Sequence, residues 1–102
     1  MKNLDELLET LRKHREFLER EFAVKKMGIF GSFAKGTATN ESDKDFYVEF
    51  DLERLTFDKF FELIEFLEGL TGRKVDIVTK DGLKTIRIPY IKEDIERSII
   101  YV

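Results

Sequence analysis

Residues 43–50 alternate between two kinds of side chain, and this alternation constrains the fold more than any other feature of the chain. In an extended strand, one face would carry the acidic and polar members: Asp43, Asp45, Tyr47 and Glu49. The other face would carry a mostly apolar set and be the buried one: Lys44, Phe46, Val48 and Phe50. The pattern therefore predicts a sheet with helices on its apolar face and carboxylates on the opposite face.

The other segments predict a short series of helices and strands around this one. In chain order, the predicted elements are a helix over residues 3–22, a strand over 24–30, the strand over 43–50, a helix over 56–70, a strand over 74–79 and a helix over 91–100. Shorter features are an N-cap at Asn3, a helical turn over 32–35, a turn at Asp81-Gly82, and extended chain at Ile86, Ile88 and Pro89. We expect an α+β fold, with a small mixed sheet and helices packed on one face, in a single domain spanning residues 1–102.

Length, charge and cysteine content exclude several classes of function. The 102 residues contain no cysteine, which rules out disulfides, thiolate metal sites and cysteine nucleophiles. The net charge of −3 argues against general binding of nucleic acid. No run of about 18 apolar residues is present to cross a membrane, and the N-terminus does not resemble a signal peptide, so a cytoplasmic location is the default. An amphipathic first helix and an apolar tail over residues 99–102 are compatible with a homo-oligomer or with core packing.

A glycine-serine turn follows the first predicted strand. Gly31 would let the backbone approach a phosphate closely, and Ser32 would add a hydroxyl donor at the start of a short helical turn. Lys35 lies one turn later and could reach a phosphate oxygen. Each feature alone also fits an ordinary turn or a surface lysine. The combination with carboxylates ten residues later favours a phosphate site.

Three aspartates predict a site for divalent cations. Asp43 and Asp45 leave the same face of one strand, roughly 6–7 Å apart along the chain. Asp76 interrupts an otherwise apolar strand and could bring a third carboxylate from a neighbouring strand. Such a set suits one or two Mg²⁺ ions, which prefer oxygen ligands and keep positions for substrate phosphates. The alternative for each aspartate is a solvated turn or an exposed strand position.

The segment from Gly31 to Phe46, with the later segment over residues 72–79, resembles the signature of the minimal nucleotidyltransferases in the DNA polymerase β-like superfamily. This resemblance implies a polymerase β palm-like core in which Gly31 and Ser32 hold the triphosphate of ATP. It also implies that the residues matching Asp43 and Asp45 bind Mg²⁺ and that Asp76 helps to activate the attacking hydroxyl. Members of the family are often paired with a HEPN-domain toxin, onto whose tyrosine the nucleotidyltransferase transfers AMP as an antitoxin.

Lys44 departs from the family pattern, which usually has an aliphatic residue between the two aspartates. Its side chain should point to the core face, where an unpaired ammonium is costly, so we expect it either to extend to solvent or to pair with a carboxylate. Lys44 also keeps an alternative function open, in which an idle site leaves a binding module that neutralises its partner by complex formation. A regulatory domain that senses nucleotide or Mg²⁺ without turnover is a third hypothesis.

Overall fold

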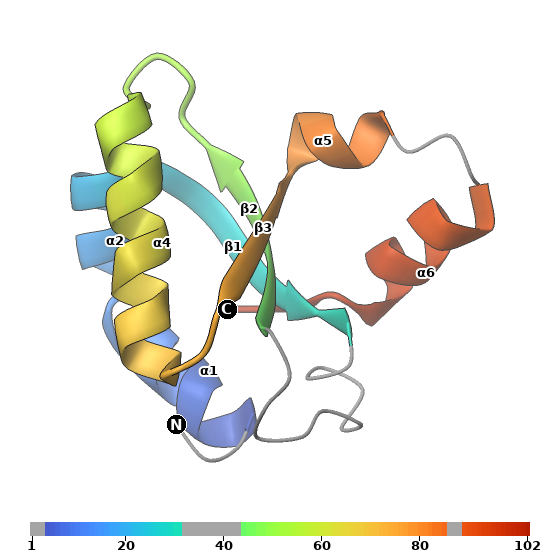
Figure 1. The fold of residues 1–102 in the computed structure, drawn as a ribbon, viewed down its shortest axis with the longest axis horizontal. Helices are drawn as coiled ribbons and strands as arrows, with labels where there is room; N and C mark the ends of the chain where they lie inside the picture. Colours follow the sequence, from blue (N-terminus) through green and yellow to red (C-terminus); the bar gives the residue numbers. More distant parts are fainter. Residues whose placement is uncertain (1–3, 32–43, 86–88) are drawn as a thin grey trace.

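The computed structural model describes residues 4–31, 44–85 and 89–102 of the chain. Figure 1 shows the elements in this order: α1 (Leu4–Lys13), α2 (Arg15–Phe22), β1 (Val24–Phe30), β2 (Lys44–Phe50), α4 (Phe57–Thr71), β3 (Val75–Thr79), α5 (Lys80–Lys84), α6 (Pro89–Ser98) and β4 (Ile100–Tyr101). The three predicted strands are therefore confirmed over their described residues, and the predicted helix over 56–70 is confirmed as α4. Within the described part of the chain, no helix is both long and apolar enough to cross a membrane.

The four strands form one mixed sheet in the order β3-β2-β1-β4. Strand β2 runs antiparallel to β1 and parallel to β3, and β4 pairs antiparallel with the other edge of β1. A parallel pair needs a long crossover connection, which α4 provides between β2 and β3. The α+β class and the mixed sheet agree with the prediction from sequence.

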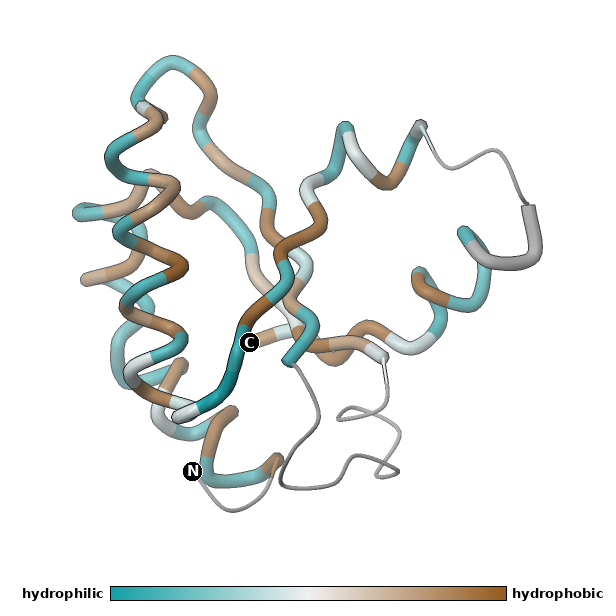
Figure 2. Tube along the Cα trace, in the orientation of Figure 1, coloured by the Kyte–Doolittle hydropathy of each residue, from teal (hydrophilic) through white to brown (hydrophobic). Residues whose placement is uncertain are grey.

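Three helices cover one face of the sheet and build the main core. Figure 1 shows α1, α2 and α4 on the same side of the strands, and the hydrophobic positions of α4 recur between hydrophilic ones in Figure 2. The members of this core that are at most 2% exposed come from all three helices and from β1 and β2: Leu7, Leu11, Leu18, Ile29, Phe46, Val48, Leu63 and Leu67. The predicted apolar face of β2 is therefore the buried one.

The ends of α4 explain why this helix occupies residues 57–71. Thr56 is extended, and its hydroxyl oxygen accepts a hydrogen bond of 3.1 Å from the backbone N–H of Lys59. At the other end, Gly72 has φ +69°, and its N–H donates to the carbonyl oxygen of Glu68. Both ends follow patterns that a sequence can reveal, because Thr often precedes the first residue of a helix and Gly often follows the last.

The predicted helix over residues 3–22 is interrupted at His14, which separates α1 from α2. The His14 backbone has φ −100° and ψ 11°, outside the regular helix, and its ring packs edge-on against Phe17 and Phe66. The prediction of one continuous helix was wrong because the hydrophobic spacing continues across this residue, whereas the chain changes direction there. The predicted N-cap, Asn3, lies outside the described residues.

The segment after β3 also differs from its prediction. Asp81-Gly82 is not a free turn but part of the short helix α5, which begins because the hydroxyl oxygen of Thr79 accepts a hydrogen bond of 3.0 Å from the N–H of Gly82. Pro89, predicted as extended, is instead the first residue of α6, a position that suits its fixed φ. Ile86 and Ile88 lie outside the described residues.

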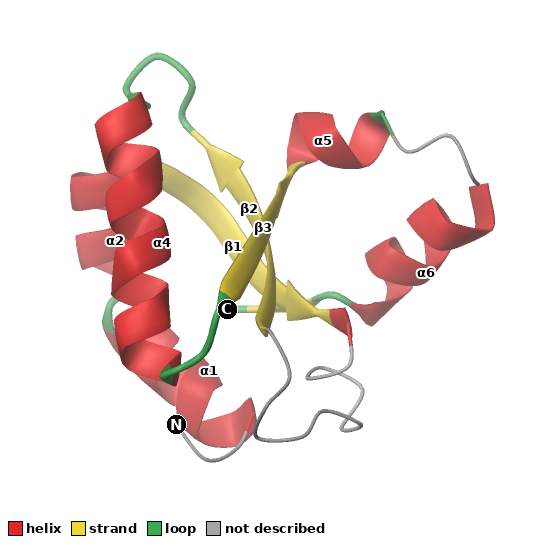
Figure 3. Cartoon of the chain, in the orientation of Figure 1, coloured by secondary structure: helices red, strands yellow, loops and turns green. Residues whose placement is uncertain are grey.

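The end of the predicted last helix is a strand. Ile100 and Tyr101 form β4 and pair with Ile29 and Gly28 of β1, so the chain leaves α6 and returns to the sheet, as Figure 3 shows. The N–H of Val102 continues the pairing with a hydrogen bond of 2.9 Å to the carbonyl oxygen of Met27. The open edge of β1 supplies the partners for this backbone, a factor that helical spacing in the sequence does not reveal.

The second face of the sheet carries its own, smaller cluster. Helices α5 and α6 lie on the side away from α1, α2 and α4 in Figure 1. Phe30, Tyr47 and Leu83 are buried there, with Val78, Ile95 and Ile99 packed against them. We call this cluster the apolar floor. It partly covers the face predicted to hold carboxylates, and the carboxylates lie at its end.

Candidate active site

Two of the three predicted aspartates are neighbours across the sheet. Asp45 of β2 and Asp76 of β3 are register partners on parallel strands. Residues paired in this way leave the same face, with their backbones roughly 4.8 Å apart. Asp45 is half-buried and Asp76 is exposed, so the pair lies where the apolar floor meets solvent. Two carboxylates in this arrangement can share a cation.

Gly31 lies directly against the carboxylate of Asp45. The preceding residue of β1, Phe30, is the register partner of Asp45 on the other side from Asp76. Gly31 has φ +77°, a left-handed conformation that favours glycine, and a Cβ placed on it would overlap Oδ2 of Asp45. The residue must therefore be glycine for two reasons, and its bare backbone stands beside the carboxylate.

Gly31, Asp45 and Asp76 thus come together, whereas the remaining predicted site residues cannot be placed. Ser32, Lys35 and Asp43 lie outside the described residues, so their roles remain predictions from sequence. Among the residues that the structure describes, no three side chains of His, Cys, Asp or Glu gather into a group that could hold a metal ion. The described carboxylates account for two members of the predicted set of three.

Tyr47 shares the face of Asp45 but belongs to the floor beneath the site. Its ring is only 4% exposed, and its hydroxyl donates a hydrogen bond of 2.9 Å to Oε2 of Glu49. Burial raises the pKa of the Tyr47 phenol, and the hydrogen bond and negative charge of Glu49 raise that pKa further. The structure therefore shows Tyr47 as a packed residue of the second face.

The floor contains residues that sequence reasoning did not connect with the site. Leu83 of α5 is buried against Phe30 and Tyr47, and Ile95 and Ile99 pack beside them. The sequence contained one sign of these residues. They are apolar and follow β3, although the predicted core did not use them. These residues bury the second face of the sheet around Tyr47, two residues along β2 from Asp45.

Lys44 lies on the core face, as its place in the alternation predicts. Its side chain is 5% exposed, so it does not extend into solvent, and its backbone N–H donates to the carbonyl oxygen of Lys74 at 2.9 Å. Burial lowers the pKa of the Lys44 ammonium, and the nearby positive charge of Arg73 lowers it further. Because neighbours in a strand point to opposite faces, this ammonium is directed away from the face that Asp45 and Asp76 share.

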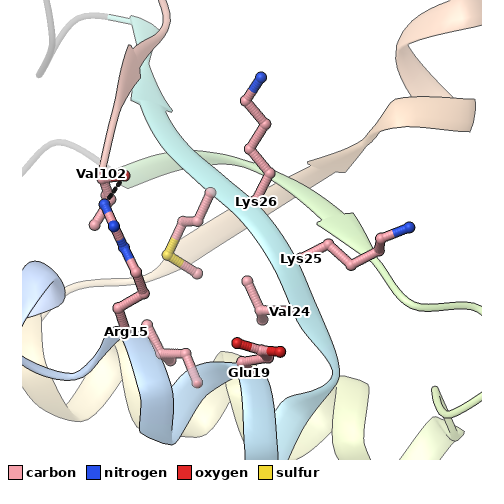
Figure 4. A pocket seen from close by; sticks show the side chains of 8 residues that line it. Arg15, Glu19, Val24, Lys25, Lys26 and Val102 are labelled. Carbon is pink, nitrogen blue, oxygen red and sulfur yellow. Dashed lines mark hydrogen bonds between the residues drawn. The ribbon is translucent and has the colours of Figure 1, made fainter.

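A small cavity of about 170 Å³ lies elsewhere, between α2, β1 and the last residue of the chain (Figure 4). Its rim carries Arg15, Glu19, Lys25 and Lys26. Arg15 is engaged in a structural contact, because its Nη2 donates a hydrogen bond of 2.7 Å to the main-chain oxygen of Val102. None of the described site residues, Gly31, Asp45 and Asp76, lines this cavity, so it is separate from the carboxylate pair.

Comparison with known sequences gives one consistent result. Residues 11–102 match a family described as the nucleotidyltransferase domain. A protein of Methanocaldococcus jannaschii, named as a candidate protein adenylyltransferase, is 48% identical over 103 residues, with both chains covered completely. The protein adenylyltransferase MntA of Thermococcus cleftensis is 38% identical over 102 residues, covering all of this chain and 98% of that protein.

Solved structures show the same fold. A structure described as that of a candidate minimal nucleotidyltransferase superposes with a TM-score of 0.64 at 39% identity, over 91% of this chain and 93% of the other. A toxin–antitoxin crystal structure with AMP-PNP gives a TM-score of 0.62 at 21% identity, over 88% of this chain and 69% of that chain. At the lower identity, the similarity shows the fold alone.

Proposed function

This chain belongs to the nucleotidyltransferase-domain family as one of its minimal members, and from that premise we propose that it transfers AMP from ATP to a hydroxyl group of a partner protein. The relatives that match along their whole length support this reaction through their names, which describe protein adenylyltransferases. We also propose that residues 1–102 act as one catalytic domain and that the reaction takes place in the cytoplasm, where ATP is available.

The observation that carries the proposal is the register pair of Asp45 and Asp76 with Gly31 packed against Asp45. A bare backbone beside two carboxylates suits a triphosphate approaching on one side and a hydroxyl acceptor on the other. We assign Gly31, Ser32 and Lys35 to the phosphates and Asp43, Asp45 and Asp76 to the cation site. The apolar floor would limit the access of water, which competes with the acceptor hydroxyl.

The proposed reaction is an in-line displacement. The acceptor oxygen forms a bond to the α-phosphorus of ATP, the bond from that phosphorus to the bridging oxygen breaks, and pyrophosphate leaves. Asp76, the exposed member of the pair, orients the acceptor hydroxyl and takes its proton. Most of the rate enhancement would come from positioning the two reactants and stabilising charge on the phosphates.

Mg²⁺ fits the chemistry of this donor set, because carboxylate oxygens are the ligands that it prefers. Asp45 and Asp76 would hold it, with Asp43 as the third ligand. When bound, the ion neutralises charge on the triphosphate and polarises the phosphorus–oxygen bonds.

For the acceptor, we propose a tyrosine of a HEPN-domain toxin, which this chain would inactivate as its antitoxin. Support comes from the family resemblance in residues 31–46 and from solved relatives of the same fold that are described as toxin–antitoxin structures. The described fold carries no separate subdomain beside the carboxylate pair, so a partner would supply the surface that presents the hydroxyl.

Intact-mass spectrometry tests the reaction and the acceptor together. Candidate HEPN-domain proteins are incubated with this chain, Mg²⁺ and ATP, and we expect a mass gain of one or more AMP units. Asp45→Asn should abolish the gain, whereas the matched control Asp81→Asn, an exposed aspartate of α5, should retain it. A gain of AMP that is equal with Asp45→Asn would contradict the proposed site.

The buried position of Lys44 favours a second candidate function, neutralisation of the partner by binding alone. Burial disfavours the charged form of the Lys44 ammonium at the end of β2, next to Asp45 in the sequence. The proposed catalysis has no use for this charge. If binding alone suffices, a toxin that arrests growth should still be neutralised by Asp45→Asn in living cells. If catalysis is required, that variant should fail although it still forms the complex.

A further inference from the structure

The outer face of α4 is an unusual surface for a helix that packs on a core. Its exposed residues all fall in one stripe along the helix, which we call the α4 stripe: Phe57, Asp58, Phe61, Glu62, Glu65 and Gly69. Phe57 is 84% exposed and Phe61 is 59% exposed, although large aromatic side chains are normally buried. In Figure 1 α4 lies at the outer edge of the molecule, with its inner side on the sheet.

A hollow lies beside Phe57, at the start of the stripe. It has a volume of about 380 Å³ and is lined by Leu55, Thr56, Phe57 and Phe60. The ring of Phe60 contacts both Phe61 and Phe50, with centroids 5.9 Å apart in each case, so the exposed ring of Phe61 continues directly into the core. Because Phe61 rests on this fixed support, its side chain would lose little conformational freedom on binding.

The far end of the stripe has a glycine that the fold itself does not require. Gly69 lies inside α4, and a Cβ placed on it would meet no atom within 4 Å. Glycine inside a helix destabilises it relative to alanine, so an open site of this kind has no reason in the isolated chain. A bare position on an exposed helix face permits another backbone to approach closely.

The charge of the stripe indicates what can approach. Asp58, Glu62 and Glu65 make no ion pair with any other described residue, and the one basic residue of α4, Lys59, is half-buried and lies outside the stripe. Nucleic acid is excluded because its phosphates would meet these carboxylates. A second copy docked through the same stripe would bring six carboxylates together without a cation, which is unfavourable.

We propose that the α4 stripe is a docking surface for a separate protein that presents an amphipathic helix with an apolar row flanked by Lys or Arg. The apolar row would cover Phe57 and Phe61 and fill the hollow beside Phe57, and the cations would pair with the three carboxylates. The helix backbone would pass close to Gly69. Because α4 covers the face of the sheet opposite to Asp45 and Asp76, the occupant would leave the candidate active site open.

Two synthetic peptides of about 20 residues test this surface on the full chain. Both are helical with one leucine row, and one carries Lys beside the row where the other carries Glu. Titrations followed by backbone amide NMR should show at least about tenfold tighter binding of the Lys peptide, with shifts confined to α4 and the preceding loop. The preference should weaken with salt, because it depends on exposed charges.

Variants then separate the parts of the stripe. The double variant with Phe57→Ser and Phe61→Ser should bind the Lys peptide at least about tenfold more weakly, and Gly69→Leu about fivefold more weakly. Leu52→Ser, which removes another exposed apolar side chain outside α4, is the matched control and should change binding less than about twofold. None of these side chains belongs to the candidate active site, so AMP transfer to the acceptor protein should remain unchanged.

Three results would overturn the proposal. Equal affinity for both peptides, or binding of neither, would show that the stripe does not select a basic helix. Unchanged binding by the double phenylalanine variant would place the contact elsewhere. A dimer in sedimentation experiments that dissociates on Phe61→Ser would show that a second copy occupies the stripe. Loss of AMP transfer alone would count against the proposed function and leave the docking surface standing.

Discussion

The two faces of the central sheet are built from the same strands but serve opposite requirements. The face under α1, α2 and α4 is a large core in which Phe46 and Val48 are fully buried. The other face has a small cluster around Tyr47 and leaves Asp45 half-buried and Asp76 exposed. Stability comes mainly from one face, and the other can therefore hold the carboxylates of the candidate site.

This difference shows how a short chain can hold a polar site without losing its core. Along β2, each step of one residue moves from one face to the other, so Asp45 and Phe46 are neighbours in sequence but lie in different surroundings. Lys44 is the exception, because it places a charge on the core face. Substitutions at these positions should therefore separate stability from activity.

The largest contrast is expected between Phe46→Ala and Asp45→Asn. Phe46 is 0% exposed, so its truncation should lower the free energy of unfolding by about 3–5 kcal/mol. Asp45→Asn should instead lower the rate of AMP transfer roughly 100- to 1,000-fold with a much smaller change in stability. Urea unfolding measures the loss of stability, and single-turnover assays measure the loss of activity. Equal losses of stability in the two variants would contradict the view that one face stabilises the protein and the other carries the site.

Gly31→Ala should be the next largest change. An alanine at φ +77° is strained by about 1 kcal/mol, and its methyl group would also displace the carboxylate of Asp45. We expect AMP transfer to fall about 10- to 100-fold. Gly72→Ala is the matched control, because Gly72 has φ +69° but open space around a Cβ. It should lose similar stability and keep its activity, so a similar loss of activity in both variants would argue against the contact with Asp45.

Lys44→Leu should stabilise the protein by about 1–2 kcal/mol at neutral pH, because it removes a buried charge. Burial and Arg73 lower the pKa of Lys44, so the unfolded chain binds this proton more tightly than the folded chain. The stability of the unsubstituted protein should therefore rise with pH between the lowered pKa and about 10.5, and this rise should be missing in the variant. Chemical unfolding at several pH values measures it, with the exposed Lys74→Leu as the control. A loss of stability in Lys44→Leu would show that the ammonium is well accommodated.

The smallest effect concerns the polar contact in the floor of the site. Tyr47→Phe removes the hydrogen bond to Glu49 and should cost about 1 kcal/mol. Because the pKa of Tyr47 is raised in the folded protein, its contribution is complete below about pH 10 and is lost as the pH rises above that value. Tyr101→Phe, at a tyrosine that is 42% exposed, serves as the comparison in alkaline unfolding. A larger effect at Tyr101 would contradict the importance of the floor.

Much of the fold could be predicted because local patterns agreed with the final structure. The alternation in β2, the cap at Thr56 and the glycine after α4 each act over a few residues, and each is present in the structure. The errors arose where distant contacts decide. Hydrophobic spacing continues through His14, although the chain bends there. Ile100 fits a helical pattern, but in the structure it belongs to β4 because its backbone pairs with the open edge of β1.

The sequence by itself determined which side chains could form a site: a glycine after a strand, and aspartates in positions that alternate with core residues. Only the tertiary structure decided that Asp45 and Asp76 share a row of the sheet, because register depends on the crossover through α4 and on the packing of both strands in one core. It also decided that Tyr47 is part of a floor, since α5 and α6 return to that face. The physical reason is range: propensity and periodicity act between neighbours, whereas register and burial depend on residues far apart in the chain.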